Sequence, residues 1–350
     1  MASVVDIFCG AGGLTHGFVR QGFNVVAGID NDIDCKFPYE QNNDTKFIHK
    51  SICDIEPQEI NALFLPNQPK ILVGCAPCQP FSSYTYKHEY QDKWDLVIKF
   101  AELIAAIKPD VFSMENVPSL VTYKGGSVFN EFIEMLDPHY RNDIWRKIVH
   151  TPNYGVPQIR KRLVVLGSRL GPIRLLEKTC DPSEYATVDE TIGSLSPIVA
   201  GEVCKYDPLH RSQGLSQLNL KRIRQSKPGG TWRDWDEELV APCHRKATGK
   251  SYASVYGRMK ADCPSPTITT QAYGFGTGRF GHPSQDRALS LREMALLQTF
   301  PNDYEFVDFE NSDCSFNRVG RLIGNAVPVL LAERIAESIE RHLEAHGYSK

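Results

Sequence analysis

Short apolar segments, each ended by small or polar residues, recur through the first half of this chain and constrain its fold more than any other feature. Helix-compatible segments such as LTHGFVRQGF, which ends near Gly22, and DLVIKFAELIAAIK, which stops before Pro109, separate them. Alternating strands and helices predict an α/β protein with a doubly wound, mostly parallel sheet, whose ligands bind at the carboxyl ends of the strands. The apolar segments are SVVDIF from residue 3, NVVAGID from 24, PKILVG from 69 and PDVFSMENV from 109.

The second half of the chain lacks this regular pattern. After the strand-like RLVVLGS at 162–168, residues 171–285 are rich in Gly, Pro, Ser and Arg and show no hydrophobic period. Helical order returns at Ser290, which has capping-box spacing with Glu293. We predict a sheet domain at 1–170, an irregular domain at 171–285 and a return to the sheet domain at 286–350. The last helix is expected after Pro328, with an apolar stripe of Val329, Ile335, Ile339 and Leu343.

Charge is distributed unevenly along the chain. The 350 residues carry a net charge of −3, yet residues 203–260 hold 12 Lys and Arg against 5 Asp and Glu, a local charge of +7. Such a segment favours contact with phosphates, and a solvated basic surface is the alternative.

The cysteines and the apolar runs bear on the compartment. Ten cysteines without the spacing of a disulfide framework predict free thiols in a cytoplasmic protein. No apolar stretch approaches the ~18 residues of a membrane span, and the first residues lack the basic region of a signal peptide. We expect a soluble protein that does not contact a membrane.

The first loop carries glycines that let a ligand approach the backbone at a helix N-terminus. Gly10, Gly12 and Gly13 follow the first strand, but the dinucleotide fingerprint fails because Thr15 stands where its third glycine belongs. Asp30, at the end of the second strand, has the carboxylate that takes ribose hydroxyls. The pair favours a nucleoside cofactor without a pyrophosphate, and an ordinary tight turn is the alternative.

Thiols, an acid and basic side chains follow the later strands. Cys78 lies between two prolines in GCAPCQPFS, and with Cys75 it forms a Cys-x-x-Cys, so a redox pair and a single nucleophile are both open. A zinc site is disfavoured because no second pair or nearby histidine has ligand spacing. Glu115 ends another strand beside Asn116 and predicts a proton donor at the same sheet edge. Gln158, Arg160 and Arg162 alternate in QIRKR and so predict three donors on one face, able to hold an anion or a base edge.

These motifs, with RALSLREMALLQTFP and GNAVP in the same order, resemble the C5-cytosine DNA methyltransferase family over nearly the whole chain. The resemblance implies a class I methyltransferase fold, S-adenosylmethionine as methyl donor, no metal, and residues 171–285 as a target-recognition domain. It assigns catalysis to Cys78 as nucleophile, Glu115 as the acid at N3 of the base, and Arg160 and Arg162 beside the cytosine and its phosphate. It assigns the cofactor to Phe8, Gly10, Gly12, Gly13, Leu14, Asp30, Asp54, Ile55, Asn325 and Val327. It assigns substrate binding to Gln79, Pro80, Ser82, Asn116, Gln158, Thr267 and Ile268.

The same resemblance implies a target and partners. The acceptor is a cytosine flipped out of double-stranded DNA, and a cognate restriction endonuclease acting separately is a possible companion. A monomer, cytoplasmic and associated with the nucleoid, is expected. Basic residues of the second domain are candidate DNA contacts, whereas its Trp and Tyr residues are expected more in a core than in stacking. The basic candidates are Lys221, Arg222, Arg224, Arg245 and Lys246.

Three other functions stay open at this point. A tRNA cytosine-5 methyltransferase would use the same motifs, although a recognition segment of more than 100 residues favours reading a duplex site in the major groove. A catalytically silent DNA-binding module is disfavoured by the intact Cys78, Glu115 and Arg160. A redox enzyme would depend on Cys75 as its attacking thiol.

Overall fold

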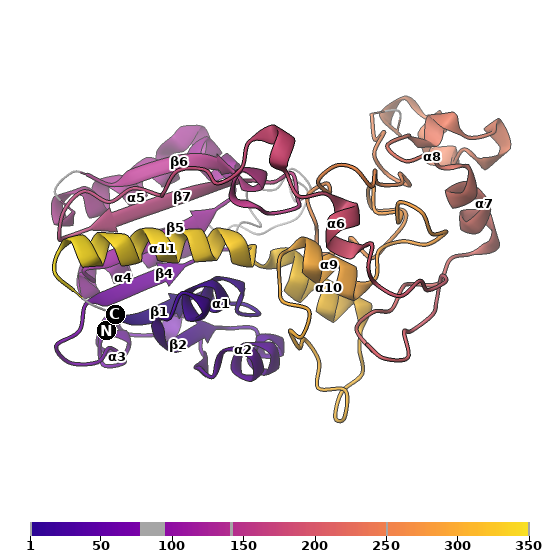
Figure 1. Ribbon diagram of the computed structural model, residues 1–350. Coiled ribbons are helices and arrows are strands. Elements are labelled where there is room, and N and C mark those ends of the chain that lie inside the picture. Colours follow the sequence, from indigo (N-terminus) through magenta and orange to yellow (C-terminus); the bar gives the residue numbers. More distant parts are fainter. Residues whose placement is uncertain (1, 78–94, 141–142, 250, 349–350) are drawn as a thin grey trace. The chain divides into compact units, whose positions relative to one another are not determined.

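The computed structural model describes residues 2–77, 95–140, 143–249 and 251–348, and a seven-stranded sheet dominates its first part (Figure 1). The strand order is β3-β2-β1-β4-β5-β7-β6. Neighbouring strands from β3 to β5 are parallel, whereas β7 runs antiparallel to both β5 and β6. The predicted doubly wound, mostly parallel sheet is confirmed. The strands are β1 (Ser3–Ile7), β2 (Asn24–Asp30), β3 (Lys46–His49), β4 (Lys70–Gly74), β5 (Val111–Asn116), β6 (Trp145–His150) and β7 (Lys161–Ser168).

Helices cover both faces of the sheet, which explains why the central strands β1, β4 and β5 are buried along nearly their whole length. On β1, Val5 and Ile7 belong to one hydrophobic cluster with residues of α4 and α5. Val4, whose side chain points the other way, belongs to a second cluster with α1 and α11. Figure 1 shows α11 running along this second face. The α-helices of the described residues are α1 (Gly13–Arg20), α2 (Lys36–Asn43), α3 (Pro57–Asn61), α4 (Asp95–Ile107), α5 (Ser127–Leu136), α6 (Val188–Ile192), α7 (Gln217–Gln225), α8 (Pro242–Arg245), α9 (Leu291–Leu297), α10 (Phe316–Asn325) and α11 (Val329–Ala345).

The two helix starts predicted near the end of the sequence are confirmed. Ser290 is the N-cap of α9, where its side chain accepts from the Glu293 N–H and the Glu293 side chain accepts from the Ser290 N–H. Pro328 is the N-cap of α11, and the four residues of its predicted stripe are all buried. The capping box satisfies two backbone donors that the first turn of α9 would otherwise leave unpaired.

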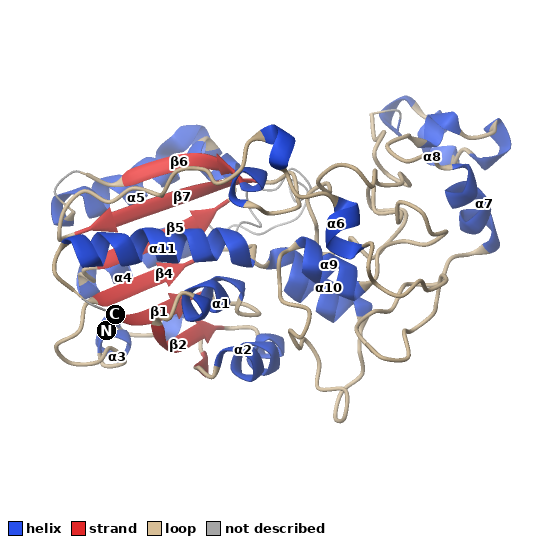
Figure 2. Cartoon of the chain, viewed as in Figure 1, coloured by secondary structure: helices blue, strands red, loops and turns tan. Residues whose placement is uncertain are grey.

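The chain forms two compact units. The sheet unit comprises Met1–Tyr154, Lys161–Thr179 and Val327–Lys350, and the irregular unit comprises Gly155–Arg160 and Cys180–Ala326. Among the described residues, the irregular unit contains short helices and loops, with isolated bridges in place of strands (Figure 2). Residues 286–326 group with the irregular unit, where α9 packs against α6 as well as against α10, and the chain returns to the sheet unit at Val327. The division of the chain by role into catalytic and target-recognition domains stays a prediction.

No helix in the described part of the chain has both the length and the apolar character needed to cross a membrane.

Candidate active site

The loop after β1 and the end of β2 meet through a direct hydrogen bond. The Gly10 N–H donates to Asp30 Oδ2 at 2.9 Å, and the Asp32 N–H donates to Asp30 Oδ1 at 2.9 Å. Gly10 has φ +54°, and a side chain added there would meet open space. Gly12, the N-cap of α1, has φ 89°, which glycine adopts without strain. The loop therefore exposes backbone beside a fixed carboxylate, which suits a nucleoside with ribose hydroxyls to donate.

The other residues assigned to the cofactor differ in exposure. Phe8 is half-buried and packs edge-on to Phe100 with ring centroids 6.2 Å apart, and Asp54 is exposed. Leu14, Ile55 and Val327 are buried in the two clusters of the sheet unit, so they can support a ligand site more readily than touch the ligand. Asn325 is exposed at the last residue of α10, in the irregular unit, and Gly13 is the first residue of α1.

A buried carboxylic acid that the sequence reasoning missed lies on β1, close to this loop. Asp6 Oδ2 accepts from the Thr15 hydroxyl at 2.7 Å, and Thr15 Oγ1 is 3.1 Å from the Tyr39 hydroxyl. Asp6 Oδ1 is buried and has no hydrogen-bond partner. Burial raises the pKa of Asp6 to about 7, the Thr15 hydrogen bond lowers it by less, and the charge of Asp30 raises it further.

The second cluster joins the ends of β4, β5 and β7 around Glu115. The Cys75 thiol donates to Glu115 Oε2 at 3.0 Å, and Arg162 Nε lies 2.8 Å from Glu115 Oε1. Glu115 is only 2% exposed, so both contacts occur in a water-poor environment. Residue Arg162 is near the start of β7, which pairs with β5. The structure therefore brings together the predicted acid and one predicted arginine, and it adds Cys75 as a direct partner of the acid.

Asn116 holds the loop that follows β4. Its side-chain amide donates to the Ala76 carbonyl at 3.2 Å, and its Oδ1 accepts from the Val117 N–H at 2.8 Å. A side chain in place of Gly74 would come within 2.8 Å of the Ile7 carbonyl oxygen, so this close packing requires glycine. The loop thus leaves the sheet from a fixed position. Cys78, Gln79, Pro80 and Ser82 lie outside the described residues.

Gln158 and Arg160 belong to a buried network in the irregular unit. Gln158 is fully buried, and its amide donates to Gln298 Oε1 at 2.8 Å while its Oε1 accepts from the Ile268 N–H at 2.9 Å. Arg160 Nη1 donates to Gln158 Oε1 at 3.2 Å and to the Ile268 carbonyl at 3.1 Å. Two of the three donors predicted on one face, Gln158 and Arg160, are therefore in direct contact, whereas Arg162 pairs with Glu115. For Gln158 to contact a substrate, it would have to break some of these hydrogen bonds and form new ones with the substrate.

Thr267 and Ile268 bind the same segment, residues 155–160, through further contacts. The Thr267 hydroxyl donates to the Ile159 carbonyl at 2.7 Å, and Ile268 is buried. These bonds explain why residues 155–160 pack with the irregular unit although they directly precede β7. The connection between the two motifs, 108 residues apart, is one that the sequence did not reveal.

The basic candidates of the irregular unit separate by burial. Arg222 is buried, donates from Nε to the Leu239 carbonyl at 2.9 Å and lies over the rings of Trp235 and Tyr256. Its guanidinium is therefore part of a small core. The remaining four candidates, Lys221, Arg224, Arg245 and Lys246, are exposed. Trp232 and Trp235 are buried in the same core, which confirms the expectation of packing for these two rings.

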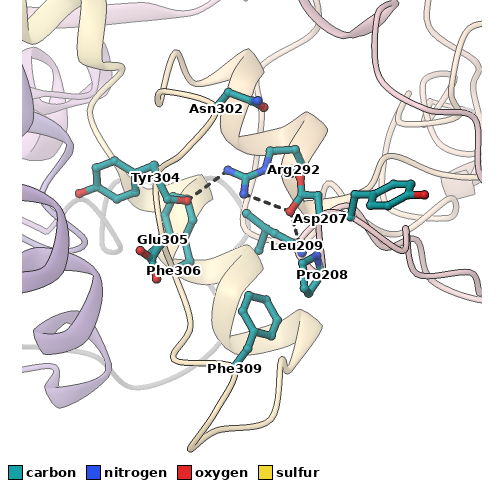
Figure 3. Close-up of a pocket in the computed structure, with 10 residues that line it drawn as sticks. Asp207, Pro208, Leu209, Arg292, Asn302, Tyr304, Glu305, Phe306 and Phe309 are labelled. Carbon is teal, nitrogen blue, oxygen red and sulfur yellow. Dashed lines mark hydrogen bonds and ion pairs between the residues drawn. The ribbon is translucent and has the colours of Figure 1, made fainter.

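A separate pocket in the irregular unit contains none of the predicted site residues. Figure 3 shows Arg292 of α9 lying between the Asp207 carboxylate and the Tyr304 carbonyl. Arg292 Nε pairs with Asp207 Oδ2 at 2.7 Å, and Nη1 donates to the Tyr304 carbonyl at 3.1 Å. The guanidinium thus joins α9 to two neighbouring segments. Elsewhere in the described residues, no three His, Cys, Asp or Glu side chains gather as metal ligands.

The order of motifs, the sheet and the buried acid at its edge agree with the comparison to known families. A family model described as C-5 cytosine-specific DNA methylase matches residues 2–341. The chain belongs to this family. As a C-5 cytosine-specific DNA methylase, it is an enzyme that transfers a methyl group to carbon 5 of cytosine in DNA.

Individual relatives cover the chain almost completely. The Type II methylase M.HgiDII of Herpetosiphon aurantiacus is 53% identical over 344 residues, 98% of this chain and 96% of that protein. The Type II methyltransferase M.PspPI of Psychrobacter sp. (strain TA137) is 31% identical over 349 residues, 98% of this chain and 80% of that protein. The crystal structure of a DNA modification methyltransferase encoded within an E. coli prophage has a TM-score of 0.74 at 20% identity, covering 98% of this chain and all of that one. That structure shows that this C-5 cytosine-specific DNA methylase shares its fold.

Proposed function

We propose that this methylase acts through a covalent bond between Cys78 and carbon 6 of a cytosine flipped out of double-stranded DNA. The observation that carries the proposal is Glu115, a nearly buried carboxyl group held between Cys75 and Arg162 at the edge where β4 and β5 end. Cys78 follows Cys75 by three residues. An acid and a nucleophile from adjacent strand ends suit a reaction that needs both on one base.

The chemistry explains these residue types. Carbon 5 of cytosine is a weak nucleophile, and addition of the Cys78 thiolate to carbon 6 turns the ring into an enamine that is nucleophilic at carbon 5. Carbon 5 then takes the methyl group from the sulfonium sulfur of the donor, whose carbon–sulfur bond breaks to leave S-adenosylhomocysteine. Glu115 supplies a proton or strong hydrogen bond at N3 as electron density moves onto the base. Arg162, and Arg160 with it, stabilise the charge that develops. Loss of the carbon 5 proton then breaks the bond to Cys78 and releases 5-methylcytosine.

The methyl donor that fits the first loop is S-adenosylmethionine, which supplies an electrophilic methyl group when bound. Asp30 would hold the ribose hydroxyls with its carboxylate, already oriented by the N–H groups of Gly10 and Asp32. Phe8, Gly10, Gly12 and Gly13 would line the loop, with Leu14 packed below it. We also propose contacts from the remaining cofactor candidates, Asp54, Ile55, Asn325 and Val327.

The substrate and partners follow from the family and from the names of the relatives. Gln79, Pro80, Ser82, Asn116, Gln158, Thr267 and Ile268 are proposed to hold the flipped base and its strand, directly or through the segments that they fix. Both relatives named above are Type II enzymes, which supports a role in a restriction-modification system beside a separate endonuclease. We propose that the enzyme works as a monomer in the cytoplasm.

Mechanism-based trapping tests the proposal. Fluorine at carbon 5 blocks the last elimination, so the purified enzyme with S-adenosylmethionine and 5-fluorocytosine-containing DNA should give a complex that resists denaturant. Cys78→Ser should abolish the complex, whereas Cys180→Ser, a matched substitution outside the predicted site, should retain it. Trapping on tRNA alone would show that the substrate is tRNA and not DNA. Trapping by Cys78→Ser would contradict the assignment of Cys78 as the nucleophile. No adduct on DNA of varied sequence would contradict the catalytic roles.

A further inference from the structure

We propose that Cys75 is a positioning residue, whose thiol sets the orientation of the Glu115 carboxyl group toward the flipped cytosine. The inference rests on the proposed role of Glu115. Its basis is a side-chain contact of 3.0 Å between Cys75 Sγ and Glu115 Oε2, in which the thiol donates. The Cys-x-x-Cys pattern suggests a redox role for Cys75 and gives no sign of its contact with Glu115.

The sheet fixes the two backbones that carry this contact. β4 and β5 are parallel neighbours with Gly74 opposite Met114, so Cys75, directly after β4, lies beside Glu115 of β5. The Cys75 N–H still donates to the Ile7 carbonyl at 3.3 Å, which extends the pairing of β4 with β1 past the end of the strand. Cys75 therefore cannot move away from Glu115 unless the backbone hydrogen bonds at this edge of the sheet are broken.

The two oxygens of Glu115 have different partners. Oε2 accepts from the Cys75 thiol, whereas Oε1 faces Arg162 Nε at 2.8 Å in an ion pair that lacks the alignment of a hydrogen bond. Contacts from β4 on one side and β7 on the other fix the plane of the carboxyl group. Oε1 keeps hydrogen-bonding capacity, and we infer that this is the oxygen presented to the base.

A thiol is suited to this position because it donates without adding charge. A lysine or arginine there would place a second cation beside Arg162, whereas the thiol donates one hydrogen bond and stays neutral. Without any donor, Oε2 would remain buried and unpaired, and the carboxyl group would turn to find another partner. The expected defect is therefore in the chemistry at the base and not in DNA binding.

The test uses the full-length enzyme and four variants: Cys75→Ala, Cys75→Ser, Glu115→Gln, and Cys75→Ala combined with Glu115→Gln. We measure the single-turnover rate of covalent trapping on 5-fluorocytosine DNA, the Kd for DNA and the Tm. Cys75→Ala should slow trapping about tenfold, the effect of one hydrogen bond, with an unchanged Kd. Cys75→Ser keeps a donor on a shorter bond, so its rate should lie between those of wild type and Cys75→Ala.

The double variant separates positioning from a general structural role. If Cys75 acts through Glu115, adding Cys75→Ala to Glu115→Gln should change the trapping rate less than twofold, about the limit of additivity error. An equal slowing on both backgrounds would overturn the proposal, as would an unaffected rate in Cys75→Ala. If Cys75→Ala lowers the Tm, the same comparison is made with Cys75→Ser, alone and in a fifth variant that combines it with Glu115→Gln. Full activity of Glu115→Gln would instead contradict the proposed function.

Discussion

Asp6 illustrates at the scale of one residue how burial alters a common side chain near a ligand loop. Its pKa of about 7 lies far above the ordinary value of 3.8, mainly because burial disfavours the charged form. The folded protein therefore holds a proton on Asp6 at a pH where the unfolded chain has released it. The stabilisation from this group is complete below about pH 3.8 and is lost as the pH rises through 7.

Replacing Asp6 with asparagine should remove this pH dependence, because the amide has the same shape and does not ionise. Between pH 6 and 8 the wild-type free energy of unfolding should fall relative to that of Asp6→Asn by about 1 kcal/mol. Urea unfolding of both proteins at the two pH values measures the difference. Asp34→Asn, at a partly exposed acid of the short 3-10 helix Ile33–Cys35, serves as the control, and an equal change in that variant would contradict the role of Asp6.

The sequence predicts the chemistry of single residues better than their contacts. Asp30 and Glu115 were predicted because each ends a strand, and a parallel sheet brings strand ends to one edge. The bond from Cys75 to Glu115 depends on which residues of β4 and β5 lie opposite each other, and no local pattern encodes that register. Asp6 was missed for a related reason, since an acid within VVDIF reads as one residue of a buried strand.

At the scale of elements, the contact between α1 and α11 depends on one glycine. A side-chain carbon added at Gly17 would lie 2.6 Å from the Glu333 nitrogen and 2.7 Å from the Ala332 carbonyl carbon. Both are backbone atoms, so the whole of α11 would have to move away from α1. Arg20 on the next turn of α1 pairs with Glu333 at 3.0 Å and so depends on the same spacing.

Gly17→Ala should therefore destabilise the protein, although alanine favours helices. The gain in helix propensity is about 1 kcal/mol, whereas overpacking against a rigid neighbour costs about 1–3 kcal/mol. We expect a net loss of roughly 1 kcal/mol and a lower Tm. Gly214→Ala, where an added carbon has its nearest neighbour at 3.9 Å, should leave the Tm unchanged. A stabilised Gly17→Ala would contradict this packing.

Elements with a strong pattern were predicted, and those with a mixed pattern were not. NVVAGID was predicted as a strand and forms β2, and DLVIKFAELIAAI forms α4. β6 was missed because its residues WRKIVH are half exposed at the sheet edge, so their apolar positions do not repeat regularly. The irregular unit is fixed by side-chain bonds such as Arg258 Nη2 to the Ile223 carbonyl at 2.8 Å, which link positions that no period relates.

At the scale of the whole molecule, positively and negatively charged residues are distributed unevenly along the chain. Residues 203–260 carry +7, and the net charge of −3 leaves −10 for the remainder. Not all of the positive residues in this segment can reach a ligand, because Arg222 and Arg258 are buried and donate hydrogen bonds to backbone carbonyls. Lys221 and Lys246 are exposed and retain charge that a DNA phosphate can meet.

The combined variant Lys221→Ala, Lys246→Ala should bind duplex DNA more weakly and with less dependence on salt. Each phosphate contact contributes about −0.9 to the slope of log K against log salt, so loss of two should flatten it by about 2. Fluorescence anisotropy from 50 to 200 mM salt measures the slope, and the Tm should not change. Lys46→Ala with Lys147→Ala removes the same charge from the two edge strands, β3 and β6. If that pair flattens the slope equally, net charge and not the basic segment governs DNA binding.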